Sequence, residues 1–307
     1  MNVHNEFQCD NTTFLDKSQG VLDRLNVMKV QEATTYRCSD YLASAPTGSH
    51  HVDAWCRSKM IEWCFQVIDF VVFSRATVLI AINYLDRFMS SGSPRARKVL
   101  KDRKEYQLAM MTALYMAIKL HEPKLIDMSL LGELSRGSYR EQDFKQMEID
   151  LLSGLKWRLA GPTAITFLEH YIVLLPLENY GIPIDDVLQS ARYQIEVSVI
   201  DYGFVGTSPS KVAVAALIQS IKAFTASTRL ASRRSKVLRA LQDLCGTDLG
   251  SASIREILRQ MECYEGLKTI PCRRHSASQC ILGTARIGCG SLVMKESHSC
   301  SPKGVSN

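Results

Sequence analysis

The chain has 307 residues, which is room for about two domains, and 46% of them are hydrophobic, so a sizeable core is expected and wholesale disorder is excluded. The formal net charge of +6, from 37 basic and 31 acidic residues, is small for this length and does not by itself indicate a nucleic-acid partner. The ten cysteines form no CxxC pair, which favours reduced thiols in an intracellular protein.

The N-terminal residues 1–19 are polar and unpatterned, and we expect a flexible tail there. They contain neither a basic start nor an apolar run, so a secretory signal is not expected. A short amphipathic helix is predicted over 20–30, and the Pro, Gly and Ser content of 42–52 indicates a linker.

Two strongly periodic helices follow. Within 54–71, apolar residues recur at three- and four-residue steps. Ser74 is the expected N-cap of the next helix, whose inward stripe runs from Val78 to Met89.

The segment 90–104 is rich in Arg and Lys, and a nucleic-acid patch is one interpretation. Because no aromatic residues interleave to stack on bases, we favour a solvated loop.

Residues 107–120 are predicted to form a central helix around which the others pack. Their apolar side chains point in every direction at 3.6 residues per turn, which is typical of a buried helix. The stretch is shorter than the roughly 20 apolar residues that cross a bilayer, so no membrane partner is expected. Lys119, near its C-terminal end, favours the helix dipole but needs a partner on a mostly buried helix.

Two more helices, over 125–134 and 142–155, complete a first helical domain that ends at the Gly161-Pro162 break. The pattern then begins again. Its expected helices share the apolar periodicity of the first set and cover 163–175, 185–203, 208–224, 232–244 and 252–264. The helix over 208–224 begins with a Ser208 cap and Pro209, and it mixes small and large apolar residues as the central helix does. We therefore predict an all-α chain with a duplicated helical domain.

From Leu267 the periodicity stops, and we expect a disordered tail over 267–307. Six tail residues could be metal ligands, but their spacings fit no zinc-finger pattern: Cys272, His275, Cys280, Cys289, His298 and Cys300. The segment HEPKL has Leu125 where the HExxH motif needs a second histidine. There is also no nucleotide-binding loop or kinase motif. The sequence thus predicts no metal site, no cofactor and no catalysis. A protein that acts by binding is the favoured functional class.

Several motifs, in the right order, resemble the cyclin family, the regulatory subunits of cyclin-dependent kinases. In the first half they are CRSKMIEW at 56–63, AINYLDRFMSS at 81–91, IKLHE at 118–122 and QMEIDLLSGLKWRLAGPT at 146–163. In the second half they are FLEHY at 167–171 and SPSKVAVAAL at 208–217. The amino-acid sequences of these motifs are most similar to those of D-type cyclins. The resemblance implies two tandem five-helix cyclin folds, over 20–160 and 161–266, between flexible tails.

The resemblance also implies roles for particular residues. Arg57 and Asp86 would form a salt bridge that ties the first two helices together. Lys119 and Glu148 would pair with each other and hydrogen-bond main-chain groups around the kinase's regulatory helix. A purely internal ion pair is the alternative, since buried charges commonly satisfy one another. Leu120 stands where many cyclins have a phenylalanine that packs on the kinase.

Many cyclins also dock substrates on a hydrophobic patch of the first box helix. The positions that match it here are Cys56, Met60, Trp63 and Gln107. Lys59 stands in place of an apolar residue, and Gln66 replaces the acid that would receive a substrate arginine. Both departures weaken the expected recruitment of basic, hydrophobic motifs.

D-type cyclins often bind retinoblastoma-like proteins through an LxCxE motif. The nearest segments here, FQCDN at 7–11 and MECYE at 261–265, are poor matches. The second also lies in a predicted helix, whereas such peptides bind extended. Ser301, before Pro302, is a candidate phosphorylation site in the C-terminal tail.

The function implied by the resemblance is that of a cyclin which binds and activates a cyclin-dependent kinase, by holding the kinase's regulatory helix in its active position, and performs no chemistry itself. Kinase inhibitors and protein substrates are further partners of such a protein, and its expected location is the nucleus and cytoplasm. Two alternatives stay open: a transcription factor built from two cyclin folds, and a cyclin-fold scaffold that activates no kinase. Lys119 with Glu148 favours kinase binding over the first alternative.

Overall fold

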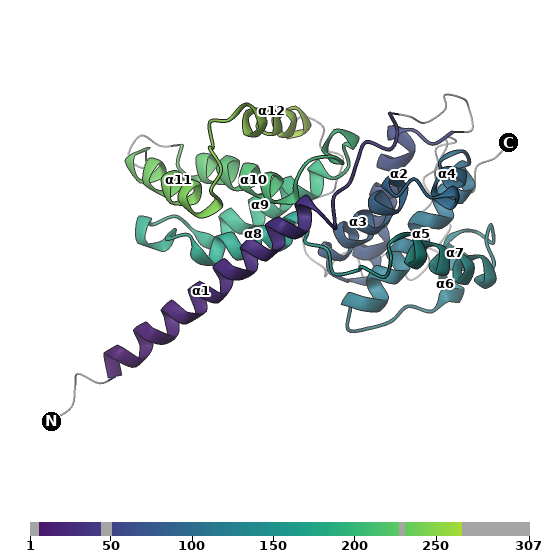
Figure 1. The fold of residues 1–307 in the computed structure, drawn as a ribbon, viewed down its shortest axis with the longest axis horizontal. Coiled ribbons are helices and arrows are strands. Elements are labelled where there is room, and N and C mark those ends of the chain that lie inside the picture. Colours follow the sequence, from purple (N-terminus) through teal and green to yellow (C-terminus); the bar gives the residue numbers. More distant parts are fainter. Residues whose placement is uncertain (1–5, 44–50, 227–230, 266–307) are drawn as a thin grey trace, which may run out of the picture. The chain divides into compact units, whose positions relative to one another are not determined.

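The computed structural model describes residues 6–43, 51–226 and 231–265 (Figure 1). Within these residues it contains twelve α-helices, two short 3-10 helices and no strand, which confirms the all-α expectation. The α-helices are α1 Glu6–Ala33, α2 Ala54–Val71, α3 Ala76–Ser90, α4 Pro94–Leu100, α5 Arg103–His121, α6 Met128–Leu134, α7 Glu141–Gly154, α8 Ala164–Leu174, α9 Ile184–Ser198, α10 Pro209–Phe224, α11 Ala231–Cys245 and α12 Ala252–Glu265. The 3-10 helices are η1 Glu178–Tyr180 and η2 Tyr202–Phe204.

The described residues form two compact units, which we name after their central helices. The α5 unit comprises residues 38–161 and 196–206, and the α10 unit comprises residues 6–37, 162–195 and 207–265. Helix α1 precedes the first helical set in the sequence, but it packs against α8 and belongs to the α10 unit.

Helix α5 is the buried centre of its unit. It packs against α2, α3, α4 and α7 (Figure 1). From Tyr106 to Ile118 every side chain is buried except the half-buried Tyr115. Ala109, Ala113 and Ala117 keep one stripe of the helix thin and have no exposed surface. The all-round apolar pattern of 107–120 therefore corresponds to a helix covered on all sides.

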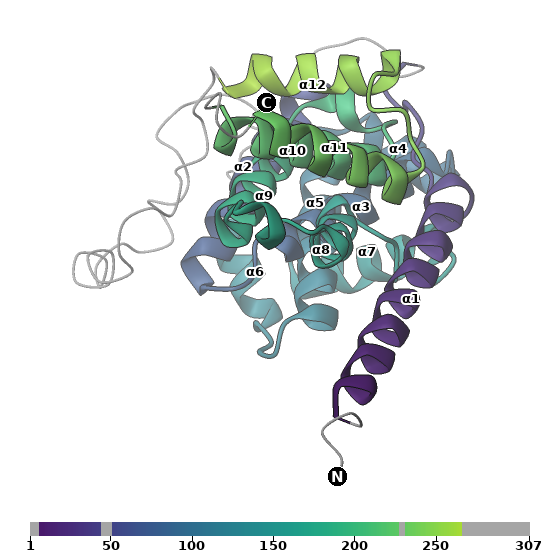
Figure 2. The same ribbon diagram turned by 90° about the vertical axis from the view of Figure 1, so that its left-hand side faces the viewer.

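Helix α10 has the same place in the second unit. It packs against α8, α11 and α12, and Figure 2 shows α10, α11 and α12 together. Pro209 is at the first helical position, as expected, although the side chain of Ser208 makes no capping hydrogen bond. Residues Val212 to Ile218 are buried throughout, so a second thin, apolar helix is surrounded by neighbours.

Helix α1 is longer than the sequence pattern indicated. Residues 6–19, part of the segment expected to be a flexible tail, are helical. The C-terminal half of α1 is anchored by apolar residues, since Leu25 and Met28 are buried there. Once that half is packed, each further helical residue gains a backbone hydrogen bond, so the polar residues before it extend the helix without a stripe of their own.

The basic segment 90–104 also differs from the expected loop, because it contains α4. Ser93 caps this helix by accepting a hydrogen bond from the backbone N–H of Ala96, and Pro94 starts it. Arg95 forms ion pairs with Glu105 at 2.8 Å and with Asp150 at 2.6 Å. The basic side chain at the start of the segment is thus paired within the fold, which removes it from a nucleic-acid patch.

The cysteines only partly follow the expectation of reduced thiols. Cys38, Cys64, Cys245 and Cys263 are free. Cys56 is disulfide-bonded, so the expectation is wrong at that position. The candidate phosphosite Ser301 and the possible metal ligands of the tail lie outside the described residues. No helix in the described part of the chain is long and apolar enough to cross a membrane.

Candidate functional site

The last turn of α5 leaves the core and exposes its charge. Helix α5 is buried up to Ile118, and the next three residues are exposed. Lys119 Nζ lies 3.2 Å from Glu148 Oε1 of the neighbouring helix α7, and the two side chains are 48% and 18% exposed. Nζ also lies 5.9 Å from the centre of the Tyr115 ring, one turn earlier. The expected pair is formed at the surface of the unit and not inside it.

Apolar side chains stand beside both charges. Leu120 follows Lys119 and is 51% exposed, and Ile149 follows Glu148 and is 56% exposed. We call these four residues the α5–α7 face. The ammonium group of Lys119 has three protons and only one acceptor among the described residues, so it can donate to a further carbonyl. The carboxylate of Glu148 can accept from a further N–H group. Such a face can bind main-chain polar groups while burying apolar surface.

Trp157, just past the end of α7, is the most exposed tryptophan of the described residues. It is 72% exposed. Lys156 and Trp157 both have left-handed backbone conformations, with φ angles of 52° and 59°. Two successive non-glycine residues in this region store strain, which clusters at functional positions. The backbone N–H of Trp157 bonds to the carbonyl of Leu152 at 3.0 Å, so the turn is held by the helix end.

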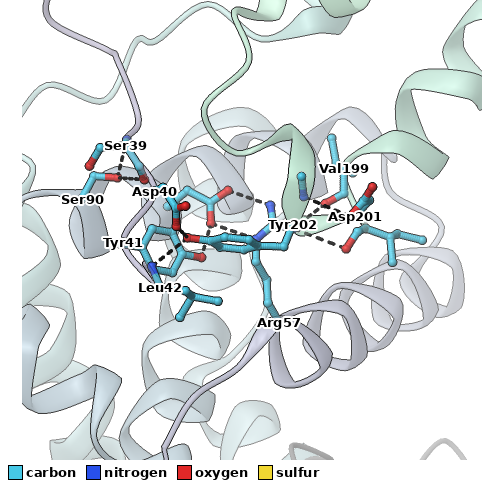
Figure 3. A network of polar contacts seen from close by, with 12 residues as sticks. Ser39, Asp40, Tyr41, Leu42, Arg57, Ser90, Val199, Asp201 and Tyr202 are labelled. Atoms are coloured by element: carbon cyan, nitrogen blue, oxygen red, sulfur yellow. Dashed lines mark hydrogen bonds and ion pairs between the residues drawn. The ribbon is translucent and has the colours of Figure 1, made fainter. Parts of the chain in front are cut away.

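Arg57 of α2 and Asp86 of α3 are joined in the core of the α5 unit. Arg57 Nε donates to Asp86 Oδ1 at 3.0 Å, and Arg57 Nη2 donates to Oδ2 at 2.7 Å. The third nitrogen, Nη1, donates to the carbonyl of Val199 at 2.7 Å (Figure 3). The expected pair is therefore bidentate, and its remaining donor is used as a buried charge requires.

Two tyrosines extend this network to the segments that flank the box helices. The hydroxyl of Tyr41 donates to Asp86 Oδ1 at 2.8 Å. The hydroxyl of Tyr202 donates to Asp40 at 2.8 Å and accepts from the backbone N–H of Leu42 at 2.8 Å (Figure 3). The two rings meet edge to face with centroids 5.2 Å apart. The residues before α2 and after α9 are thus fixed to α2 and α3 by one continuous set of polar contacts.

Burial and charge set the protonation of this network. Burial, and then the Asp86 carboxylate, raise the pKa of Tyr41 well above its usual value. Burial opposes the charge of Arg57, but the Asp86 carboxylate outweighs it and raises the pKa of the guanidinium. Arg57 is therefore charged and Tyr41 is neutral, so the hydrogen-bond directions just given persist across the physiological pH range.

The comparison with known families agrees with this geometry. Residues 23–160 match the family described as "Cyclin, N-terminal domain", and residues 162–277 match "Cyclin, C-terminal domain". The chain belongs to the cyclin family. The α5–α7 face and the Arg57–Asp86 pair lie within the first match, whereas Val199, Tyr202 and helix α10 lie within the second.

The relatives include several cyclin types. The chain is 32% identical to Cyclin-D3-3 of Arabidopsis thaliana over 174 residues, which cover 54% of this chain and 45% of that protein. It is 27% identical to G2/mitotic-specific cyclin-B3 of Drosophila melanogaster over 209 residues, covering 67% of this chain and 32% of that one. The match therefore spans less than half of either relative. The resemblance to D-type cyclins is confirmed, alongside A- and B-type relatives.

A solved structure shows the same fold. The X-ray structure of a viral cyclin from herpesvirus saimiri matches with a TM-score of 0.52 and 16% identity, and it covers 77% of this chain and 97% of that one. At this identity the likeness concerns the fold alone. It agrees with the expected tandem arrangement of two cyclin folds.

In this cyclin the residues of the expected substrate-docking patch are buried. Cys56, Met60 and Gln107 have no exposed surface, and Trp63 is 4% exposed. Lys59, one of the two departures from the family pattern, pairs with Glu62 at 2.9 Å. The indole N–H of Trp63 and the amide nitrogen of Gln107 are buried without an acceptor among the described residues. The structure thus buries these side chains and does not present them on an open surface.

The two segments compared with LxCxE are both helical. Residues 7–11 lie in α1, and residues 261–265 lie in α12, where Met261 is buried. An LxCxE peptide binds in an extended form, so neither segment has the required conformation. A retinoblastoma-like partner finds no support at these positions.

Sequence reasoning missed Ile149 and Trp157. Ile149 is apolar but falls outside the buried stripe of α7, which contains Phe144, Met147 and Leu151. Trp157 stands between Lys156 and Arg158 beyond the periodic part of the helix. An apolar residue out of phase with its helix, and a tryptophan between two charges, are the sequence signals that could have indicated both.

Proposed function

We propose that this cyclin binds a cyclin-dependent kinase through the α5–α7 face and thereby activates it. The observation that carries the proposal is the Lys119–Glu148 pair at 3.2 Å, which is partly exposed and flanked by the exposed Leu120 and Ile149. A surface ion pair alone is common and contributes little. A pair flanked by exposed apolar side chains offers polar groups that a partner's main chain can use once water is excluded.

The mechanism is a shift between two kinase conformations. The kinase's regulatory helix is rotated out when the kinase is alone, so its catalytic lysine and glutamate cannot pair. Lys119 can donate to carbonyl groups and Glu148 can accept from N–H groups around that helix only when the helix is rotated in. The cyclin then shifts the population by its difference in affinity for the two states. The chain performs no chemistry of its own in this account.

A rigid scaffold is what this mechanism requires. The α5–α7 face stands on a helix that is buried through Ile118, and the same unit contains the bidentate Arg57–Asp86 pair. Little conformational entropy is then lost on the cyclin side when the kinase binds. Trp157 adds a large apolar anchor of the kind that dominates binding energies at interfaces.

The test is isothermal titration of purified cyclin-dependent kinases with Lys119→Ala and Glu148→Ala, together with an assay of kinase activity. We expect each variant to weaken kinase affinity and activation by roughly 100-fold, which corresponds to about 2.8 kcal/mol. The matched control is Arg192→Ala, which removes a pair of similar length, Arg192–Glu169 at 2.8 Å, on the surface of the α10 unit. Unchanged affinity in both face variants would reduce the Lys119–Glu148 pair to an internal contact and contradict the proposal.

A further inference from the structure

A groove of about 400 Å³ lies between α10, α11 and α12 in the α10 unit. Its apolar lining consists of Ile218 from α10, Leu238 from α11, Leu258 from α12 and Leu249 from the turn before α12. Ile218 is buried, and the three leucines are half-buried, so the floor is apolar and reaches the surface. The volume falls in the range of about 300–1,000 Å³ that is typical of ligand pockets.

Two cations stand at the edge of this groove, Lys222 from α10 and Arg239 from α11, and both are exposed. Among the described residues no ion pair or hydrogen bond joins either one to a carboxylate. Asp243, one turn after Arg239 on the same helix, does not pair with it. By contrast, Arg259 on the outside of α12 pairs with Glu256 at 2.6 Å. Neither cation of the groove is therefore paired with an anion in the described part of the chain.

The position of Lys222 repeats that of Lys119. Each is the third residue from the end of the central helix of its unit, since α5 ends at His121 and α10 ends at Phe224. Lys119 has the Glu148 carboxylate 3.2 Å away, whereas Lys222 has no counterpart to that acid in the described part of its unit. The duplicated domain thus presents a second lysine at the same place, beside an apolar groove and without its anion.

We infer that this groove docks an acidic segment of a partner protein that carries large apolar side chains. The apolar side chains would be buried against Leu238, Leu249 and Leu258, and the carboxylates would pair with Lys222 and Arg239. This site is separate from the α5–α7 face, so the inference goes beyond kinase binding and does not depend on it.

Charge and lining chemistry decide against the other occupants. The chain's own residues 266–307 contain six Lys and Arg side chains and a single acid, Glu296, so they do not complement a basic groove. A second copy of the chain brings a net charge of +6. A single-stranded nucleic acid would need aromatic side chains for stacking, and none lines the groove. An acidic, apolar peptide satisfies both the cations and the leucines.

The experiment uses fluorescence anisotropy with the full chain and a fluorescein-labelled peptide, Glu-Asp-Leu-Glu-Phe-Asp-Asp. Two control peptides replace its acids by lysine or its leucine and phenylalanine by serine. We expect the parent peptide alone to bind. Lys222→Glu and Arg239→Glu should each weaken its binding by about tenfold or more. The matched control Lys236→Glu makes the same charge change at an exposed residue of α11 that does not line the groove, and it should weaken binding by less than about twofold.

A second readout locates the peptide without any substitution. The parent peptide should shift the methyl resonances of Leu238, Leu249 and Leu258 in a methyl-labelled sample and leave those of the α5 unit unchanged. Circular dichroism of each variant checks that the fold is retained.

The inference is overturned if the parent peptide fails to bind at about 1 mM, a Kd too weak for a specific site. It is also overturned if the serine peptide binds equally or if Lys236→Glu has the same effect as Arg239→Glu. A concentration-dependent dimer lost in Arg239→Glu would assign the groove to a second copy and overturn it too, and so would displacement of the peptide by a single-stranded oligonucleotide.

Discussion

Arg57 and Asp86 are joined by two hydrogen bonds of 3.0 and 2.7 Å and are both buried in the α5 unit. The remaining Arg57 nitrogen reaches the Val199 carbonyl, and Tyr41 reaches the carboxylate from another side. This one pair therefore joins α2 and α3 to the segments 38–42 and 196–206. In the proposed function, its role is indirect: it keeps the scaffold of the α5–α7 face rigid.

The first prediction follows from that relationship. Asp86→Ala leaves a buried guanidinium without its anion, and we expect the free energy of unfolding to fall by about 3–5 kcal/mol. The measurement is urea unfolding followed by circular dichroism. Glu169→Ala, which breaks the exposed pair with Arg192, is the control and should cost about 0–1 kcal/mol. Equal losses in the two variants would show that the buried network is not a special source of stability.

Alkaline pH should destabilise the fold through Tyr41. Burial and Asp86 raise the pKa of Tyr41 well above 10.0, so the folded chain keeps this proton when the unfolded chain loses it. The stability that depends on it is complete below about pH 10 and declines as the pH rises above that value. Tyr41→Phe should make the decline shallower by about 1.4 kcal/mol per pH unit. Urea unfolding at a series of pH values measures the slope, and an identical slope in the variant would contradict the assignment.

Substitution of Gly154 tests the packing of α7 against Phe88 of α3. A Cβ atom there would lie 2.5 Å from Cδ2 and 2.7 Å from Cε2 of Phe88, whose ring is fully buried. Gly154→Ala should therefore destabilise the chain by about 1–3 kcal/mol, although alanine favours helices. Gly132→Ala, in α6, meets only the Tyr139 carbonyl at 3.7 Å and serves as the control. Its melting temperature should be unchanged or higher, and a rise for Gly154→Ala as well would contradict the packing argument.

Trp157 allows binding and stability to be separated. Trp157→Gly removes an exposed ring and also relieves a left-handed backbone, with φ at 59°, so the melting temperature of the free chain should not fall. Kinase affinity should fall by roughly 30-fold, since an aromatic anchor at an interface contributes about 2 kcal/mol or more. Lys156→Gly relieves the neighbouring φ of 52° but keeps the ring, so it should bind the kinase as the original chain does. Wild-type affinity for Trp157→Gly would place the ring outside the interface.

The sequence predicted the parts of this fold that depend on local periodicity. The all-round apolar run of 107–120 identified α5, and the repeat at 208–224 identified α10. It could not predict contacts that join distant segments, such as Tyr202 with Leu42, because no periodicity relates them. It also missed residues 6–19 of α1, since a helix extended from a packed half needs no stripe of its own. For the site, Lys119 and Glu148 followed from a resemblance, whereas Trp157 could be recognised only from its exposure in the structure.

The measurement that tests the kinase-binding account most directly is the affinity of the double variant Lys119→Glu with Glu148→Lys. The two groups are partly exposed, so the swapped pair should form in the free chain and the melting temperature should stay within the small range of a surface pair, about 0–1 kcal/mol. The kinase main chain would then meet a carboxylate where it offers carbonyls and an ammonium where it offers N–H groups. We predict that isothermal titration finds kinase affinity as low in the swap as in the single alanine variants. Affinity restored to that of the original chain would show that the two charges interact only with each other. That result would contradict the account.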